Sequence, residues 1–119
     1  MHRVILISAI LTAWIGYAAL LADEPLTETQ KIERLIEHVG KLGKAKFVRN
    51  DIEYDAESAE KFMRAKWKAM GADIKTAAEF IEKIATKSST TGKPYLIRFP
   101  DGKERKSGEY LGEQLKLLD

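Results

Sequence analysis

Apolar residues recur every three or four positions in four stretches of the chain, which is the spacing of helices with one buried face. The first stretch begins at Thr27, which has capping-box spacing with Gln30, and we predict that it ends at Gly43. The second begins with Asp55 as its N-cap and ends at Gly71. The predicted inward positions of the two helices are Ile32, Leu35, Ile36, Val39 and Leu42, then Ala59, Phe62, Met63, Trp67 and Met70.

Two more helices follow the same logic. Thr76 and Glu79 form a second capping box, and a narrow apolar stripe follows it. Ser107 is predicted to cap the last helix. The apolar positions of these two helices are Ala77, Phe80, Ile81, Ile84 and Ala85, then Tyr110, Leu111, Leu115 and Leu118.

Between the helices, short stretches have the pattern of strands. Residues 47–49 and 52–54 flank Asn50-Asp51, two residue types that tolerate the left-handed backbone of a tight turn, so we predict a hairpin. Residues 95–99 alternate, and the turn at Pro100-Asp101-Gly102 leads into a polar edge strand at 103–106. The predicted order is α-β-β-α-α-β-β-α, an α+β domain whose small antiparallel sheet of two hairpins is covered by about four helices. The pattern does not say whether the hairpins join into one sheet.

Residues 1–22 have the pattern of a secretory signal peptide. Arg3 precedes an uncharged stretch, residues 4–22, which Asp23 and Glu24 end. We therefore expect cleavage after Ala22, a single domain over residues 23–119, and a periplasmic location. The alternative is an uncleaved inner-membrane anchor formed by residues 4–22, which is the one case in which we expect contact with a membrane.

Composition excludes several classes of function. The chain has no cysteine, so disulfide frameworks, thiol catalysis and cysteine metal sites are ruled out. Its 20 Lys and Arg nearly balance its 18 Asp and Glu, which gives no strong field for nucleic acid. The chain outside the signal has a single histidine, His38, with no second ligand at helical spacing. The alternating acids from Asp51 to Glu57 lack the glycine and the glutamate of a calcium loop, so we expect neither a metal nor a cofactor.

The hydroxyl-rich loop 87–93 invites two nucleotide or nucleophile interpretations. A Walker loop needs glycine where Lys87 stands and Ser or Thr where Pro94 stands, and it follows a strand instead of a helix. A Ser-x-x-Lys nucleophile sits at a helix start, which Pro94 prevents here. Two alternatives stay open for the loop: contact with an anion or ligand, or a hydrogen-bonded loop that closes the helix against the strand.

A second candidate surface combines arginines with aromatic residues. These residues are either the lining of a recognition groove or, in the alternative, core aromatics beside solvated arginines. They are Arg49, Tyr54, Trp67, Tyr95 and Arg98.

Several of these stretches resemble one family. Phe47-Val48-Arg49-Asn50, Tyr54, Ile74-Lys75-Thr76-Ala77 and above all Ser88-Ser89-Thr90-Thr91-Gly92-Lys93-Pro94-Tyr95 resemble the YfeK-like family of small exported bacterial proteins, a domain of unknown function. Asp51 and Phe62-Met63 depart from the family pattern, which has glycine, and histidine followed by leucine, at those places. The resemblance implies an exported protein and brings no activity with it.

Taken together, the sequence favours a non-enzymatic binding or interaction module with no catalytic residue. Its partner is an unknown envelope protein or ligand, and its contact surface centres on the 88–95 loop and the hairpin at Arg49-Asn50. The alternative is a small hydrolase or transferase of envelope sugars that uses paired carboxylates such as Glu53 and Asp101. The candidate binding residues are Arg49, Asn50, Tyr54, Lys87, Ser88, Ser89, Lys93, Tyr95 and Arg98.

Overall fold

The computed structural model describes residues 24–119, and the predicted signal segment lies outside them. The order of elements confirms the predicted α+β fold. None of the helices within residues 24–119 has the length and apolar content to cross a bilayer. The elements are α2 (Glu28–Gly40), β1 (Lys46–Arg49), β2 (Ile52–Asp55), α3 (Ala56–Met70), the 3₁₀ turn η1 (Gly71–Asp73), α4 (Ala77–Phe80), the π-helical turn η2 (Ile81–Ala85), β3 (Leu96–Arg98), β4 (Glu104–Lys106) and α5 (Ser107–Leu118).

The two hairpins join into one antiparallel sheet with the strand order β2-β1-β3-β4. Phe47 stands at the junction, because it faces Tyr54 across β2 and Ile97 across β3. Both hairpin turns have the backbone that their residues predict: φ is 53° at Asn50, 67° at Asp51 and 88° at Gly102. The sheet register therefore brings β1 and β3, which are far apart in sequence, side by side.

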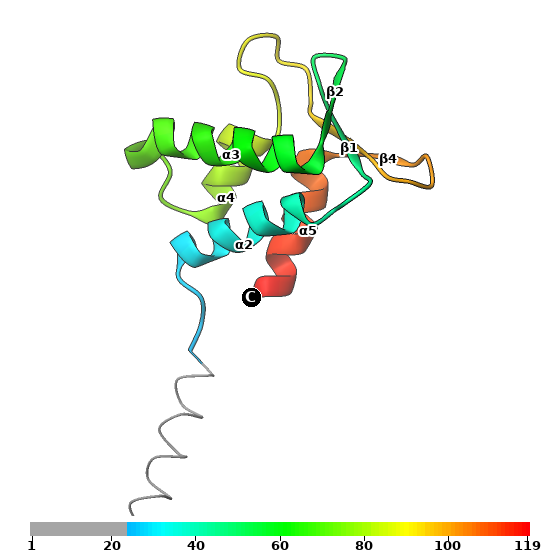
Figure 1. The fold of residues 1–119 in the computed structure, drawn as a ribbon. Coiled ribbons are helices and arrows are strands. Elements are labelled where there is room, and N and C mark those ends of the chain that lie inside the picture. The colour runs from blue at the N-terminus through cyan, green and yellow to red at the C-terminus, as the bar shows by residue number, and fades with distance from the viewer. Residues whose placement is uncertain (1–23) are drawn as a thin grey trace, which may run out of the picture.

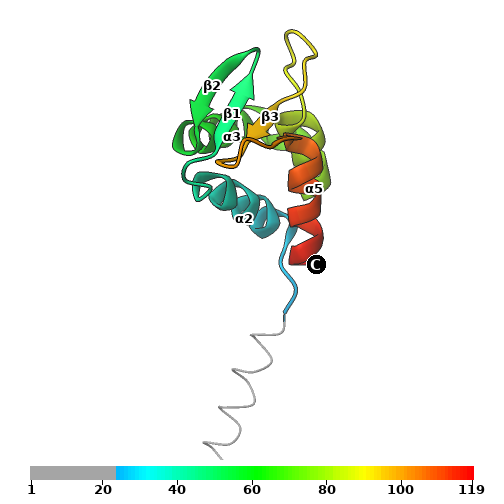
Figure 2. The same cartoon turned by 90° about the vertical axis from the view of Figure 1, so that its right-hand side faces the viewer.

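Helices cover one face of this sheet. α3 contacts β1 and β2, α5 contacts β4, and α2 packs against α3, α4 and α5 (Figures 1 and 2). The inward row of the sheet is Tyr54, Phe47, Ile97 and Arg105, since directly paired residues share a face. The opposite face carries mostly charged side chains. The largest fully buried apolar side chains of the core are Ile32, Leu35, Ile36, Val39, Phe80, Ile84, Ile97 and Leu111.

Local capping explains where the helices begin. Both capping boxes are present: the Gln30 amide donates to Thr27 Oγ1, and the Glu79 amide donates to Thr76 Oγ1 at 3.1 Å in each case. Asp55 caps α3 by accepting a hydrogen bond from the Ser58 amide at 2.8 Å. These contacts satisfy backbone donors that a helix leaves free at its first turn.

Three details differ from the prediction. The first helix ends at Gly40 with Lys41 as its C-cap, and Gly43, with φ of 59°, lies in the following turn. The third helix changes after Phe80 into the π-helical turn. Ser107 does not cap α5, because it is already the first helical residue, and Lys106 occupies the cap position without a side-chain hydrogen bond. β4 runs directly into α5, and the Ser107 amide donates to the Tyr95 carbonyl at 2.9 Å.

Acid is expected to weaken the cap of α4. Hydrogen bonds, chiefly from the Lys75 amide, lower the pKa of Glu79 in the folded protein. A carboxyl with a lowered pKa binds its proton more weakly in the folded than in the unfolded chain, so its stabilisation is present above its unfolded pKa and disappears as the pH falls through the folded pKa. We therefore expect Glu79→Gln to lower stability at pH 7 and to make little difference at pH 2.5. Urea unfolding at the two pH values measures this, with Glu82→Gln, an exposed position in η2, as the control; a Glu79→Gln effect equal at both values would contradict it.

Candidate functional site

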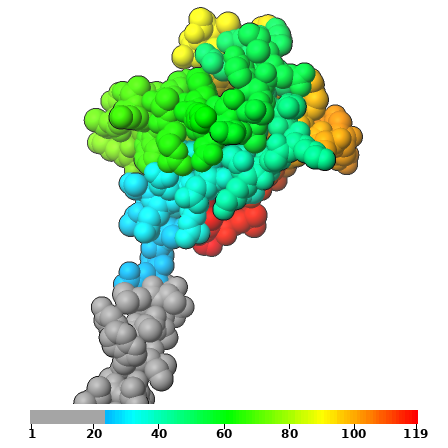
Figure 3. Space-filling model, in the orientation of Figure 1, coloured from blue at the N-terminus to red at the C-terminus, as the bar shows by residue number. Residues whose placement is uncertain are grey.

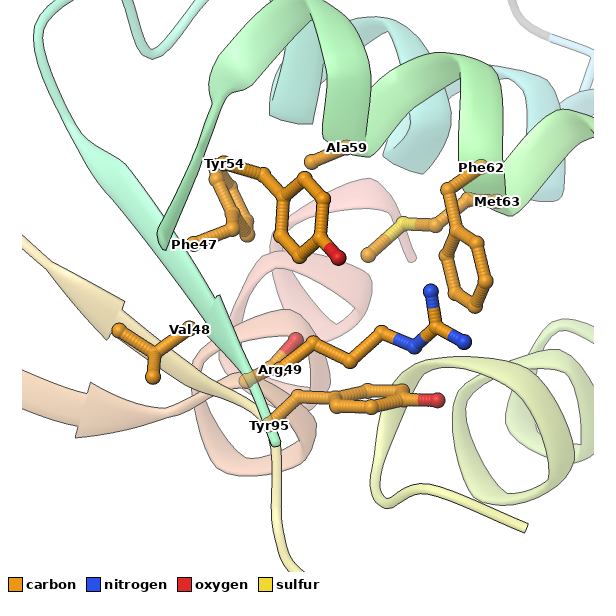
Figure 4. A pocket seen from close by; sticks show the side chains of 9 residues that line it. Phe47, Val48, Arg49, Tyr54, Ala59, Phe62, Met63 and Tyr95 are labelled. Atoms are coloured by element: carbon orange, nitrogen blue, oxygen red, sulfur yellow. The ribbon is translucent and has the colours of Figure 1, made fainter. Parts of the chain in front are cut away.

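A small pocket lies between the inward face of the sheet and α3. Its cavity volume is about 90 Å³, and Figure 4 shows β1 and α3 forming opposite walls. Most of the lining side chains are apolar or aromatic. Arg49 is the one charged residue among them, and Ser107 contributes an aliphatic hydroxyl. The lining residues are Phe47, Val48, Arg49, Tyr54, Ala59, Phe62, Met63, Tyr95 and Ser107.

Arg49 is the charged residue of the pocket. It is the last residue of β1, two positions after Phe47 on the same strand face, and its head lies between the rings of Phe62 and Tyr95 (Figure 4). The guanidinium carbon is 4.4 Å from the centre of the Phe62 ring, a cation–π contact. Arg49 Nε is buried and has no hydrogen-bond partner. Arg49 as a whole is only partly buried, but its covered Nε leaves one donor unpaired, which costs free energy.

A second cation lies beside the first. Lys66 stands one helical turn after Phe62 on α3, and its Nζ is 5.6 Å from the Phe62 ring and 5.9 Å from the Tyr95 ring. Burial, and then the charge of Arg49, lower the pKa of Lys66. Desolvation raises the pKa of Tyr95 against the opposing effect of Arg49. Within residues 24–119, all the ion pairs are formed by other side chains, so the two cations face each other without a counter-ion.

The hydroxyl of Ser107 is the other unusual polar group. Ser107 is fully buried at the start of α5, and its Oγ has no hydrogen-bond partner. In the part of the chain that the structure describes, Arg49 Nε and Ser107 Oγ are the two buried side-chain atoms left unpaired, and both residues line this pocket. These two atoms are therefore hydrogen-bonding groups of the pocket region that no other described side chain or backbone group satisfies.

Five side chains join the hairpin turn to the 88–95 loop, and we call them the latch: Asn50, Asp51, Ser88, Thr91 and Lys93. Ser88 is 3% exposed, and its Oγ accepts from the Thr90 and Thr91 amides and from Asn50 Nδ2 at 3.2–3.3 Å. Thr91 Oγ1 donates to Asn50 Oδ1 at 2.6 Å, and Lys93 pairs with Asp51 at 2.8 Å. Figures 1 to 3 show the turn and the loop at one end of the molecule.

The latch lies directly next to the pocket in the sequence. Asn50 follows Arg49, and Pro94, which forms a bridge with Lys87, precedes Tyr95. The geometry supports the interpretation of the loop as one that closes the helix against the strand. Ser88 is buried and its hydroxyl is used internally, while Lys87 and Ser89 remain exposed. The loop therefore braces the ends of the segments that carry Arg49 and Tyr95.

Of the five predicted groove residues, three meet in the pocket: Arg49, Tyr54 and Tyr95. Trp67 packs edge-on against Phe80, with ring centres 6.3 Å apart. Arg98 projects from the other sheet face and pairs with Glu53 at 3.2 Å and Glu104 at 2.7 Å. Trp67 and Arg98 thus follow the alternative of a packed aromatic and a solvated arginine.

The acidic residues and the histidine lie elsewhere. Glu53 is held by Arg98, and Asp101 Oδ1 accepts from the Lys103 amide at 2.9 Å in the β3–β4 turn. His38 Nε2 shares a hydrogen bond of 2.7 Å with Tyr110 Oη. Over residues 24–119 no three acidic or imidazole side chains gather as metal ligands would.

Sequence reasoning assigned Phe62 and Met63 to the inward side of their helix and Ser107 to a cap. The structure places Phe62, Met63 and Ser107 around the pocket, with Lys66 against two of its rings. The spacing of Phe62 and Lys66, four residues apart on one helix, was an available signal for an aromatic–cation pair. No local signal pointed to Ser107, because its part in the pocket depends on how α5 meets β3.

Comparisons with known proteins give a family and one relative. Residues 26–119 match a family of unknown function, DUF5329. The uncharacterized protein YfeK of Salmonella typhimurium (strain LT2) is 35% identical over 68 residues. That alignment covers 57% of this chain and spans 57% of the length of the relative. No solved structure matches the chain.

Proposed function

Because the chain belongs to the DUF5329 family, whose function is unknown, we propose a function from the pocket itself: a non-enzymatic module that binds a small ligand, or a short part of a partner, between β1 and α3. The sequence pattern of residues 1–22 supports an exported location for this module. The binding residues are Arg49, Tyr54, Phe62, Tyr95 and Ser107, with Lys66 beside them.

The observation that carries the proposal is the pairing of two unsatisfied polar atoms with one cavity. A buried donor or acceptor without a partner costs about 1–3 kcal/mol. Arg49 Nε and Ser107 Oγ both carry that cost and both line the pocket. Both atoms are covered by neighbouring side chains, so a ligand reaches them when those side chains shift. Hydrogen bonds from the ligand to both atoms then offset the cost.

The composition of the pocket supports binding over chemistry. Its lining has no carboxylate and no imidazole, the groups that most often transfer protons in enzymes. Arginine stays protonated, and burial raises the pKa of Tyr95 and so keeps its hydroxyl protonated. Glu53 and Asp101, the carboxylates of the hydrolase alternative, lie outside the lining.

We expect Arg49→Met to leave the free energy of unfolding within about 1 kcal/mol of the unsubstituted protein while it impairs binding. Methionine keeps the apolar stem that packs on Phe62 and removes the unpaired nitrogen. Residues retained for function are often replaced without loss of stability. Urea unfolding measures the first part, with Arg98→Met, on the opposite face, as the matched control. A loss of more than about 2 kcal/mol would show that Arg49 serves the fold.

Binding is tested by NMR with three probes that share one branched five-carbon skeleton: 3-methylbutan-1-ol, 3-methylbutylamine and 3-methylbutanoate. At least one probe should shift the amide signals of Phe62, Met63 and Tyr95. The same probe should fail with Ala59→Leu, since Ala59 lines the pocket and a larger side chain fills part of it. If none of the three shifts these signals, or if Ala59→Leu, shown to be folded, responds equally, the pocket is not a binding site.

A further inference from the structure

We infer that the pocket takes a carboxylate that bears a short aliphatic group, either a free acid or the C-terminal residue of a peptide. The inference rests on the proposed function and adds the chemical class of the ligand.

Charge is the first reason. Arg49 and Lys66 contact the same Phe62 ring at 4.4 and 5.6 Å, and within residues 24–119 neither has an acidic partner. Two neighbouring cations repel each other, and an anion between them turns repulsion into attraction. A cationic ligand adds to the repulsion, and a neutral one leaves it unchanged. The electrostatics therefore select an anion.

Donor chemistry is the second reason. The unpaired atoms are the Nε of a planar guanidinium and a hydroxyl that can donate. A carboxylate has two acceptor oxygens in one plane, so it can accept two parallel hydrogen bonds from the nitrogens along one edge of a planar guanidinium. Its remaining lone pairs can accept from a hydroxyl. A phosphate monoester carries more charge and a third terminal oxygen, which fits a small and mostly apolar cavity less well than a carboxylate does. The unpaired donors therefore favour a carboxylate.

Size is the third reason. A cavity of about 150 Å³ is known to hold benzene, whereas this one is about 90 Å³. It has the space of about three water molecules, which is enough for an aliphatic group of about three or four carbons. Phe47, Ala59 and Met63 give that group an apolar surround. Leucine or valine side chains fit this description.

The experiment compares affinities within the same three probes. We expect 3-methylbutanoate to bind the protein about 10- to 100-fold more tightly than the alcohol does. The reason is that a hydrogen bond to a charged group contributes more than one between neutral groups. The amine should bind more weakly than the alcohol. Arg49→Met should bring the ratio of the affinity for the acid to the affinity for the alcohol close to one. Lys66→Met should reduce this ratio, and Arg98→Met should leave it unchanged. Titrations followed by NMR at pH 7 give each dissociation constant.

The outcomes separate this inference from the proposed function. If the alcohol binds as tightly as the acid, and Ala59→Leu abolishes both, the pocket binds ligands but the carboxylate class is wrong. If no probe binds, both proposals fail. When the acid is preferred, a second pair of ligands, N-acetyl-Gly-Leu and its C-terminal amide, distinguishes a peptide C-terminus from a free acid as the natural ligand. Tighter binding of the peptide acid than of both its amide and 3-methylbutanoate assigns the site to chain ends, whereas tighter binding of 3-methylbutanoate assigns it to free acids.

Discussion

Phe80→Ala should lower the free energy of unfolding by about 3–5 kcal/mol, the cost of emptying a buried phenylalanine site. Phe80 is fully buried at the junction of α4 and η2, and its ring meets that of Trp67 edge-on at 6.3 Å. The loss combines transfer of the ring to water, a cavity in the core and one aromatic contact. Domains of this size are stable by about 5–15 kcal/mol, so the variant should be close to unfolding.

Urea unfolding measures the change, and Leu117→Ala is the matched control. Leu117 is 76% exposed, so its truncation should change stability by less than about 0.5 kcal/mol. If Phe80→Ala is too unstable to study, Phe80→Leu should show a smaller loss in the same direction. A loss below about 1.5 kcal/mol for Phe80→Ala would mean that the π-helical turn relaxes and fills the space.

The second large effect is expected for Ser88→Ala, at about 1–3 kcal/mol, because three donors lose a common acceptor. These are the Thr90 and Thr91 amides and Asn50 Nδ2, and the serine itself is buried. The substitution should also weaken binding of 3-methylbutanoate, since the latch fixes the ends of the segments that carry Arg49 and Tyr95. Urea unfolding and the NMR titration measure the two effects separately.

Ser89→Ala is the matched control for Ser88→Ala. It changes the neighbouring hydroxyl, which is exposed and takes no part in the latch, so both stability and affinity should stay as they were. A double-mutant cycle of Ser88→Ala with Asn50→Ala should give less than the sum of the single losses, because the two residues share a hydrogen bond. Equal losses for Ser88→Ala and Ser89→Ala would show that the latch hydrogen bonds do not stabilise the domain.

Lys93→Ala should change the free energy of unfolding little, because the ion pair of Lys93 with Asp51 is solvent-exposed.

The parts of the fold that sequence reasoning predicted are those fixed by neighbouring residues. Thr76 and Glu79 specify a helix start within four residues, and Asn50-Asp51 specifies a turn within two. Joining the hairpins depends on the pairing of Phe47 with Ile97, fifty residues apart. The apolar period of 77–85 fits an α-helix equally well, so it could not reveal the π-helical turn.

The same limit applies to the pocket. Arg49, Tyr54 and Tyr95 were expected together because arginine and aromatic residues are frequent in recognition sites. Serine at a helix start usually caps the helix, so Ser107 was assigned to that role. Its actual environment arises from contact between the start of α5 and Tyr95, which stands just before β3, and no local pattern encodes this contact. The 88–95 loop was predicted to be the centre of a contact surface, and in the structure its Ser88 hydroxyl is bonded to the loop itself and to Asn50.

The order β2-β1-β3-β4 also bears on self-association. Both outer strands leave one row of backbone groups unpaired, and such rows can recruit a strand from another molecule and start polymerisation. Here β2 has four residues and β4 three, and charges occupy both, with Glu53 and Asp55 on one and Glu104, Arg105 and Lys106 on the other. Short, charged edges are the usual protection against aggregation. Both sheet edges of this domain therefore carry such protection, with Ile52 as the one exposed apolar residue on β2.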